Sequence, residues 1–149
     1  MSENVLTSNS SVVLDTCVLV AGLRSFDGAS NKILQLVANQ SIVPFVTTAL
    51  FLEYEDVLSR DTFLEATGFT LHDVDRFLAA FASAARPVDV HFRWRPQLRD
   101  PKDELVLECA VNAGDLPLIT HNIRDFSDAA KRFSVPVTTP GKFLKRSFQ

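Results

Sequence analysis

Short apolar runs rich in Val, Ile and Leu alternate along the chain with longer segments in which apolar residues recur at helical spacing. The short runs predict buried β-strands, because the strands of a parallel sheet are covered on both faces and read as nearly continuous apolar sequence. We expect strands at residues 12–14, 42–46, 116–120 and 135–138, and residues 87–92 are a further candidate.

The segments with helical spacing predict the helices between these strands. A polar stretch that contains Gly22, Asp27 and Gly28 follows the first strand. We expect helices at residues 33–38, from Thr47 or Thr48 to about 59, and at 62–66, 71–85, 101–113 and 125–133, with a small one after Pro140. Because strands and helices alternate, the fold class is α/β with a mainly parallel central sheet.

Length and composition fit one domain. The chain has 149 residues, of which 46% are hydrophobic, and we expect a flexible N-terminal lead-in at residues 1–10 and a single domain at residues 11–149. No apolar run approaches the roughly 20 residues that span a bilayer, and the N-terminus does not have the pattern of a signal peptide. Cys17 and Cys109 form no disulfide framework and are expected to be reduced core residues. We therefore expect a cytoplasmic protein without a membrane partner.

The charge balance limits how the chain meets nucleic acid. A formal net charge of −3 argues against a protein that wraps duplex nucleic acid, but not against an enzyme that binds it in one cleft. Arg24 and Lys32 follow the first strand and are candidates for RNA-phosphate contacts, with solvated surface charge as the alternative. The segment Arg93, Trp94 and Arg95 is a candidate for stacking on a base, with an ordinary surface turn as the alternative.

Two carboxylates follow predicted strands. Asp15 ends the first apolar run, and Asp125 comes after the strand at 116–120, with Thr120 and Asn122 nearby. Parallel sheets bind ligands outside the carboxyl ends of their strands, so we expect both acids at that edge. The alternative for Asp15 is the cap of a turn.

Two more carboxylates, Glu53 and Asp103, fall on or beside the apolar arcs of two helices. Glu53 is three residues after Leu50 and four before Val57, at the border of an arc; the alternative is an edge residue whose head is solvated. Asp103 is three residues before Val106, within the buried arc of its helix. It also fits an acid in the first helical turn, stabilised by the helix dipole, and the two interpretations are compatible.

Converging acids predict a divalent metal site, because carboxylates removed from water repel one another unless a cation compensates. Oxygen ligands of this kind suit Mg²⁺ or Mn²⁺. We expect catalytic roles for Asp15, Glu53, Asp103 and Asp125. Asp15, Asp103 and Asp125 are the expected metal ligands, and Glu53 completes the shell or orients a water. The second tier of polar contacts is Thr16, Thr120 and Asn122.

The order and spacing of these segments resemble the PIN-domain (PilT N-terminus-like) family, especially its bacterial and archaeal toxins of type II toxin–antitoxin systems. The resemblance covers about Val12 to Leu144. It is carried by residues 12–20 (VVLDTCVLV), Glu53 with 57–60 (VLSR), 100–103 (DPKD) with 107–110 (LECA), 118–126 (LITHNIRDF), and 137–140 (VTTP) with Phe143 and Leu144.

The resemblance implies a three-layer α/β/α sandwich and a Mg²⁺- or Mn²⁺-dependent endoribonuclease. By motif position Asp15, Glu53 and Asp103 match the three most regular acids of the family. Many relatives have Asp where Asn122 stands, so here Asp125 has to supply the fourth carboxylate or the site works with three. The resemblance also implies RNA as substrate, a cognate antitoxin that covers the acids, and a homodimer or higher homo-oligomer. Phe63, Phe69 and Phe81 are candidates for an interface or for the core.

Two other functions are open at this level. With Asn122 in place of an acid, the chain also fits a catalytically weakened PIN-like module that binds RNA or a protein partner. Asp15 at a strand end also suits an aspartyl-phosphate enzyme. Haloacid-dehalogenase-type phosphatases usually have a second Asp two residues later, however, and Cys17 stands there.

Overall fold

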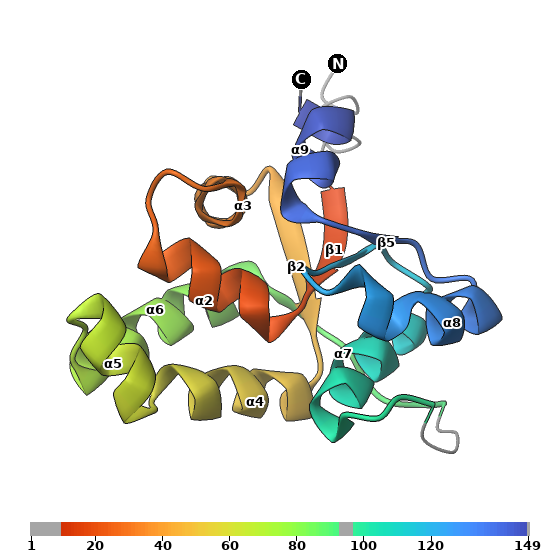
Figure 1. Cartoon of the computed structure of the whole chain (residues 1–149), viewed down its shortest axis with the longest axis horizontal. Helices are drawn as coiled ribbons and strands as arrows, with labels where there is room; N and C mark the ends of the chain where they lie inside the picture. The colour runs from red at the N-terminus through yellow and green to blue at the C-terminus, as the bar shows by residue number, and fades with distance from the viewer. Residues whose placement is uncertain (1–9, 93–96, 149) are drawn as a thin grey trace.

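The computed structural model describes residues 10–92 and 97–148 (Figure 1). Its centre is a five-stranded sheet with the order β3-β2-β1-β4-β5, and every pairing is parallel. The strands are β1 (Ser10–Leu14), β2 (Ile42–Val46), β3 (Arg86–Pro87), β4 (Leu118–Ile119) and β5 (Val137–Thr138). The predicted fold class is therefore confirmed. Residues 1–9 of the expected lead-in and the candidate stacking segment at 93–95 lie outside the described residues.

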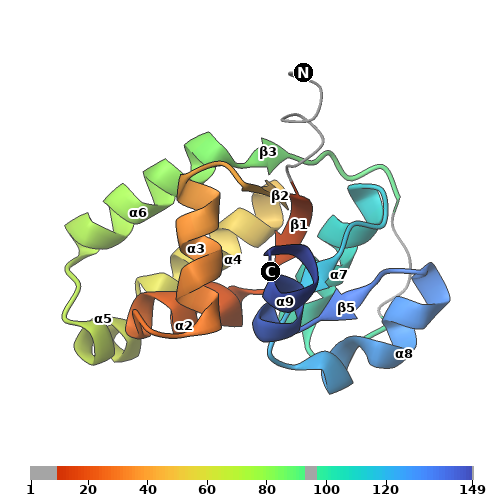
Figure 2. The same cartoon turned by 90° about the horizontal axis from the view of Figure 1, so that it is seen from above.

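Helices cover both sides of the sheet. They are α2 (Thr16–Arg24), α3 (Ala29–Ala38), α4 (Thr48–Leu58), α5 (Asp61–Thr67), α6 (Leu71–Ala84), α7 (Pro101–Asn112), α8 (Ile123–Phe133) and α9 (Pro140–Phe148). Helix α3 packs on β2, whereas α7 packs on β1, β2 and β4, and both views show α3 and α7 on opposite sides of the central strands (Figures 1 and 2). This is the expected α/β/α layering. Among the helices that the structure describes, none is long and apolar enough to cross a membrane.

Local signals set the starts of three helices near the site and behind it. The Thr47 hydroxyl accepts a hydrogen bond from the backbone N–H of Leu50 and caps α4, and the Asp100 carboxylate caps α7 just before Pro101. Thr70 forms a capping box at the start of α6. These caps satisfy N–H groups that have no partner within the helix, and they explain why the helices begin close to the predicted positions.

Several element assignments differ from the prediction. Helix α3 begins at Ala29, four residues before its expected start, and β4 and β5 are each shorter than expected. Helix α2 occupies the region expected as an apolar run and a polar stretch; its buried Val18 and Leu19 continue the apolar run of β1 without a visible change of period. The candidate strand at 87–92 is instead the two-residue edge strand β3, and an edge is where Pro87, which has no N–H, is tolerated. Helix α8 begins at Ile123, two residues before its expected start.

The core is apolar and contains residues of the central sheet and of the helices on both sides of it. Val12, Val13 and Leu14 of β1 are fully buried. Of the three aromatic residues expected at an interface or in the core, Phe63 and Phe81 are buried and Phe69 is half-buried against the core. Packing inside the monomer therefore accounts for all three.

Gly22 marks the closest approach of α2 to α3. A Cβ at this position would lie 2.6 Å from Leu34 Cδ1 and 3.0 Å from the backbone oxygen of Ser30. The Asn31 amide also donates a hydrogen bond of 2.8 Å to the Gly22 carbonyl. Glycine in a helix interior normally costs stability, so its presence here is explained by the close helix–helix contact.

We predict that Gly22→Ala lowers the free energy of unfolding by about 1–3 kcal/mol, because the added methyl group overpacks a rigid contact. The matched control is Gly141→Ala in α9, where a Cβ would meet nothing within 4 Å; this change should be neutral or stabilising by up to about 1 kcal/mol. Urea unfolding of both variants measures the difference. Equal stabilisation by the two substitutions would contradict the packing argument.

Candidate active site

Asp15 lies at the carboxyl end of β1 and is held by β4. Its backbone N–H donates to the Ile119 carbonyl at 3.0 Å. Its carboxylate Oδ2 accepts hydrogen bonds from the Thr120 hydroxyl at 2.6 Å and from the Cys17 thiol at 3.3 Å. Asp15 occupies the N-cap position of α2 but makes no side-chain capping hydrogen bond, so the turn-cap alternative does not explain this carboxylate. It is a buried acid, only 6% exposed, with its orientation set by Thr120.

Helix α4 is tied to the same strand end through Tyr54. The buried Tyr54 hydroxyl donates a hydrogen bond of 2.6 Å to the carbonyl of Leu14, the residue before Asp15. Glu53 precedes Tyr54, and its side chain is 11% exposed. The Lys102 ammonium lies 3.9 Å from the Glu53 carboxylate. The hydrogen bond of Tyr54 therefore positions Glu53 close to the carboxyl end of β1.

The first turn of α7 supplies the third acid. Asp100 caps the helix by accepting from the Lys102 backbone N–H at 2.9 Å, which places Asp103 in the first helical turn. The buried residues Val106, Leu107 and Ala110 hold α7 in the core. Asp103 is half-buried, as expected for an acid on the inner arc of this helix.

These three acids line one pocket of about 480 Å³, hereafter the acidic pocket. Asp15, Glu53 and Asp103 reach it from the end of β1, from α4 and from α7, respectively. Of the other predicted residues, Thr16, Asn122 and Arg24 also line it, whereas Thr120 acts from behind through Asp15. Lys32 is exposed on α3 and is not among the residues that line this pocket.

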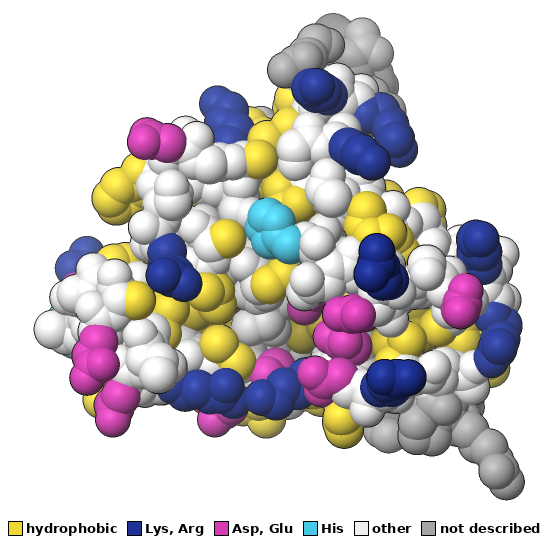
Figure 3. Space-filling model, in the orientation of Figure 1, with side chains coloured by type: hydrophobic (Ala, Val, Ile, Leu, Met, Phe, Trp, Pro, Cys, Tyr) yellow, Lys and Arg dark blue, Asp and Glu magenta, His cyan; other side chains and the backbone are white. Residues whose placement is uncertain are grey.

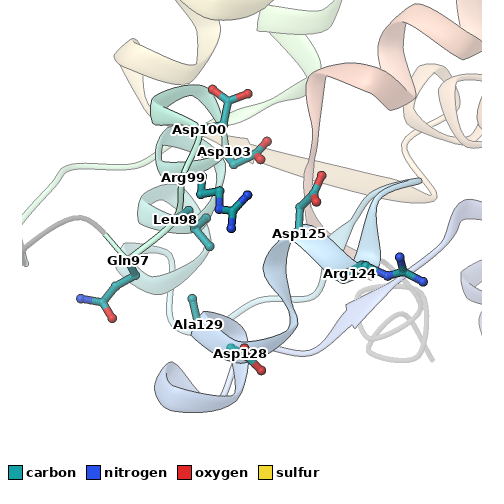
Figure 4. A pocket seen from close by; sticks show the side chains of 9 residues that line it. All are labelled: Gln97, Leu98, Arg99, Asp100, Asp103, Arg124, Asp125, Asp128 and Ala129. Carbon is teal, nitrogen blue, oxygen red and sulfur yellow. The ribbon is translucent and has the colours of Figure 1, made fainter.

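Asp125 lies in the first turn of α8 and lines a second pocket of about 510 Å³, hereafter the flanking pocket. Figure 4 shows the carboxylates of Asp103 and Asp125 turned toward the same space between α7 and α8. Asp100 and Asp103 line both pockets, so they form the boundary between them. The structure thus brings Asp125 beside Asp103 but outside the pocket that holds Asp15 and Glu53.

The acids disturb one another's protonation. Burial, and then the negative charges of Asp15, Asp100, Asp125 and Glu104, raise the pKa of Asp103 to about 6. Burial also raises the pKa of Glu53, while Lys102 acts in the opposite direction. A cation in the acidic pocket would relieve this repulsion.

Cys17 packs against the edge of the core and also lies beside the acids, whereas Cys109 is buried in the core as expected. Cys17 lines the acidic pocket and is half-buried, and both cysteines are free thiols. Burial and the adjacent Asp15 raise the pKa of the Cys17 thiol to about 12. Cys17 therefore remains a neutral thiol at pH 7 and serves as a weak hydrogen-bond donor to Asp15.

Several residues of the site were not predicted from the sequence. Asp100 and Lys102 entered only as part of the segment at 100–103, and Tyr54 was not singled out. Asp100 is two residues away from Lys102 and three from Asp103, a spacing that places them together in one helical turn and could have been used. The contact of Tyr54 with Leu14 joins residues 40 positions apart and has no local signal. The flanking pocket adds two cationic residues, Arg99 and Arg124.

The donors fit a hard divalent cation in kind, because they are carboxylates at a partly water-excluded position, where burial raises the pKa of Asp103 and of Glu53. Their arrangement is looser than a formed metal site. Within residues 10–92 and 97–148, no group of three or more His, Cys, Asp or Glu side chains is assembled so that it could hold a metal ion.

Comparison with known proteins gives one family. A family model described as "PIN domain" matches residues 11–124, which include Asp15, Glu53 and Asp103. No curated protein and no solved structure matches the chain significantly.

We predict that the unfolding temperature in EDTA rises as the pH falls from about 7.5 to 5. The native pKa of Asp103, about 6, lies above its ordinary value of 3.8. Its protonation therefore contributes stability that is fully present below about 3.8 and is lost as the pH rises through about 6. Asp103→Asn should unfold at a higher temperature than the wild type near pH 7.5, and this advantage should shrink below pH 6.

Thermal unfolding followed by circular dichroism across this pH range measures both effects. Glu55→Gln is the control, since Glu55 is an exposed carboxylate on the outer side of α4; it should keep the wild-type profile. A constant difference between Asp103→Asn and the wild type at every pH would refute the role of Asp103.

Proposed function

The chain belongs to the PIN-domain family, and from this membership and the acidic pocket we propose that it is a Mg²⁺- or Mn²⁺-dependent endoribonuclease. PIN domains are generally nucleases. The observation that carries the proposal is that Asp15, Glu53 and Asp103, from three separate elements, line one pocket. Repulsion among the acids makes this arrangement costly without a cation.

In the proposed site, Asp15 and Asp103 hold the metal directly. Asp125 completes its shell from the side of the flanking pocket, and Glu53 orients the attacking water. The hydrogen bonds from Thr120 and Cys17 to Oδ2 of Asp15 keep that carboxylate in one orientation and limit the reorganisation needed on binding.

The bound metal would lower the pKa of a water and offset negative charge on the scissile phosphate. Lys102 reduces the local negative charge beside Glu53, and Arg24, at the rim of the acidic pocket, contacts an RNA phosphate. Asp103 must lose its proton to bind a cation, so metal binding at this site weakens below a pH of about 6.

We extend the proposal to the biological role. The sequence segments that resemble toxins of type II toxin–antitoxin systems support a cytoplasmic toxin that is held inactive by a cognate antitoxin, and that forms a homodimer or a higher homo-oligomer. Co-expression with the product of the neighbouring gene tests this role. Suppression of growth inhibition and a stable complex are expected, and growth inhibition that persists with no complex would count against it.

A second candidate function is a PIN-like module that binds RNA or a protein partner but does not cleave. Asn122 in the acidic pocket and the loose arrangement of the acids in the described residues favour it. Calorimetric titration with Mn²⁺, together with an RNA-cleavage assay, separates the two functions. A non-cleaving module should bind Mn²⁺ only weakly and should not cleave RNA.

We predict that cleavage of structured RNA stops in EDTA and returns with Mn²⁺ or Mg²⁺. Asp15→Asn and Asp103→Asn should each lower the cleavage rate by at least about 100-fold, because each removes a negative oxygen ligand. Both variants should keep the wild-type circular dichroism spectrum. Glu55→Gln again serves as the charge-matched control. Metal-independent cleavage, or wild-type turnover by either variant, would contradict the proposed mechanism.

We predict a smaller effect at the fourth acid. Asp125→Asn should raise the Mn²⁺ concentration for half-maximal cleavage about tenfold, as expected for a ligand at the periphery of a shell. Adding Asn122→Asp to this variant should restore the affinity, because residue 122 lines the acidic pocket itself. An unchanged Mn²⁺ dependence in Asp125→Asn would mean that the site works with three acids.

A further inference from the structure

Helices α3 and α9 carry a group of exposed cations on the same side of the molecule as the acidic pocket. The group, hereafter the C-terminal basic face, consists of Lys32, Lys142, Lys145 and Arg146. Helix α9 packs on α3, and Figure 3 shows Lys and Arg side chains gathered over α9. Residues 142, 145 and 146 are three and four positions apart and therefore lie on one side of α9.

The basic face opposes the charge of the rest of the chain. Helices α3 and α9 together contain four Lys or Arg residues and no Asp or Glu, whereas the whole chain has a formal net charge of −3. An isolated cationic surface on an acidic protein attracts a polyanion locally without making the whole molecule adhere to nucleic acid.

Helix stability explains only half of this group. Lys145 and Arg146 lie in the last turn of α9, where cations interact favourably with the helix dipole. Lys32 and Lys142 lie in the first turns of α3 and α9, where a cation is unfavourable. The helix dipole therefore does not account for the placement of these two lysines.

The basic face and the acidic pocket lie on the same face of the molecule and are linked through α3. His121 lines that pocket, and its Nε2 lies 2.8 Å from the hydroxyl of Ser30 on α3, two residues before Lys32. Figure 3 shows this order on one face of the molecule, with acidic side chains low in the view, a histidine near the centre and the cations over α9 at the top.

Helix α9 packs through its apolar side and exposes a polar side. Phe143 is buried, and Leu144 and Phe148 pack against the core, so the apolar side chains of α9 turn inward. The Thr139 hydroxyl accepts from the Lys142 backbone N–H at 3.2 Å and caps the helix. The exposed side therefore offers charge without an apolar anchor, which suits a phosphate backbone better than a membrane or an amphipathic peptide.

We propose that the C-terminal basic face binds the sugar-phosphate backbone of a single RNA strand that continues from the acidic pocket past His121. This inference rests on the proposed ribonuclease function, because it assigns the path of that substrate. The contacts are to phosphates, so binding is independent of sequence. The face acts as an exosite that adds affinity for RNA longer than the segment held in the acidic pocket.

The test is RNA binding in EDTA, where the metal-free acids repel RNA and the contribution of the exosite is therefore largest relative to that of the acidic pocket. Fluorescence anisotropy with a labelled single-stranded RNA of about 20 nucleotides measures the dissociation constant at several salt concentrations. The variant is Lys32→Ala/Lys142→Ala. Its charge-matched control is Arg76→Ala/Arg86→Ala, two exposed cations on α6 and β3, which lie along the opposite side of the molecule from α9 (Figure 2).

We expect the lysine variant to bind about tenfold more weakly than the wild type at low salt. The slope of log affinity against log salt should fall by about 1.4, which corresponds to two lost phosphate contacts on a single strand. Its unfolding temperature should be equal to or above that of the wild type, because the two cations are unfavourable at helix starts. The arginine control should bind like the wild type.

Three results would overturn the proposal: no RNA binding by the wild type, equal salt slopes for the lysine variant and the wild type, or equal weakening by the arginine control. A fourth such result is tight binding of a Glu-rich peptide through the two lysines without any binding of RNA, which would favour an acidic protein partner.

Cleavage with Mn²⁺ is assayed separately. A wild type that binds in EDTA but never cleaves would refute the nuclease function alone, and a cleaving wild type with equal slopes would refute the exosite alone.

Discussion

β1 is hydrogen-bonded along both edges, to β2 and to β4, and its last three residues are fully buried. At its carboxyl end, the Asp15 N–H bonds to Ile119, and the Leu14 carbonyl accepts from Tyr54 of α4. One strand end therefore sets the positions of β4 and α4 together. Because all strands are parallel, this end lies at the edge where their loops and helices begin, and the acids that follow meet there.

Bringing these acids close together costs electrostatic free energy. Burial and neighbouring acids raise the pKa of Asp103 to about 6, so the fold keeps a carboxylate where it is least stable as an anion. Folding stability alone would favour an apolar residue at this place. Membership of the PIN-domain family and the position of Arg24 and Lys102 beside the same pocket are the grounds on which we propose that this cost serves the binding of a cation and a phosphate.

Much of the fold could be predicted from the sequence because the apolar periods of strands and helices differ. Helices α4 and α7 begin close to their predicted starts, where Thr47 and Asp100 cap them through hydrogen bonds within three residues of themselves. Helix α2 could not be separated from β1, since its inward-facing residues extend the apolar run of the strand without a break. The edge strand β3 was misplaced because two residues, Arg86 and Pro87, leave no periodic signal.

The sequence alone determined which acids stand at strand ends and on buried helical arcs, since both depend on local spacing, and it predicted that Asp15, Glu53 and Asp103 belong to one site; the structure shows that they line one pocket. Only the tertiary structure decided which residues line the same pocket. It placed Asp125 in the flanking pocket and Asn122 in the acidic one, and it brought Tyr54 to Leu14 and His121 to Ser30. These contacts join segments tens of residues apart, and their distances follow from the packing of helices on the sheet, which no local pattern encodes.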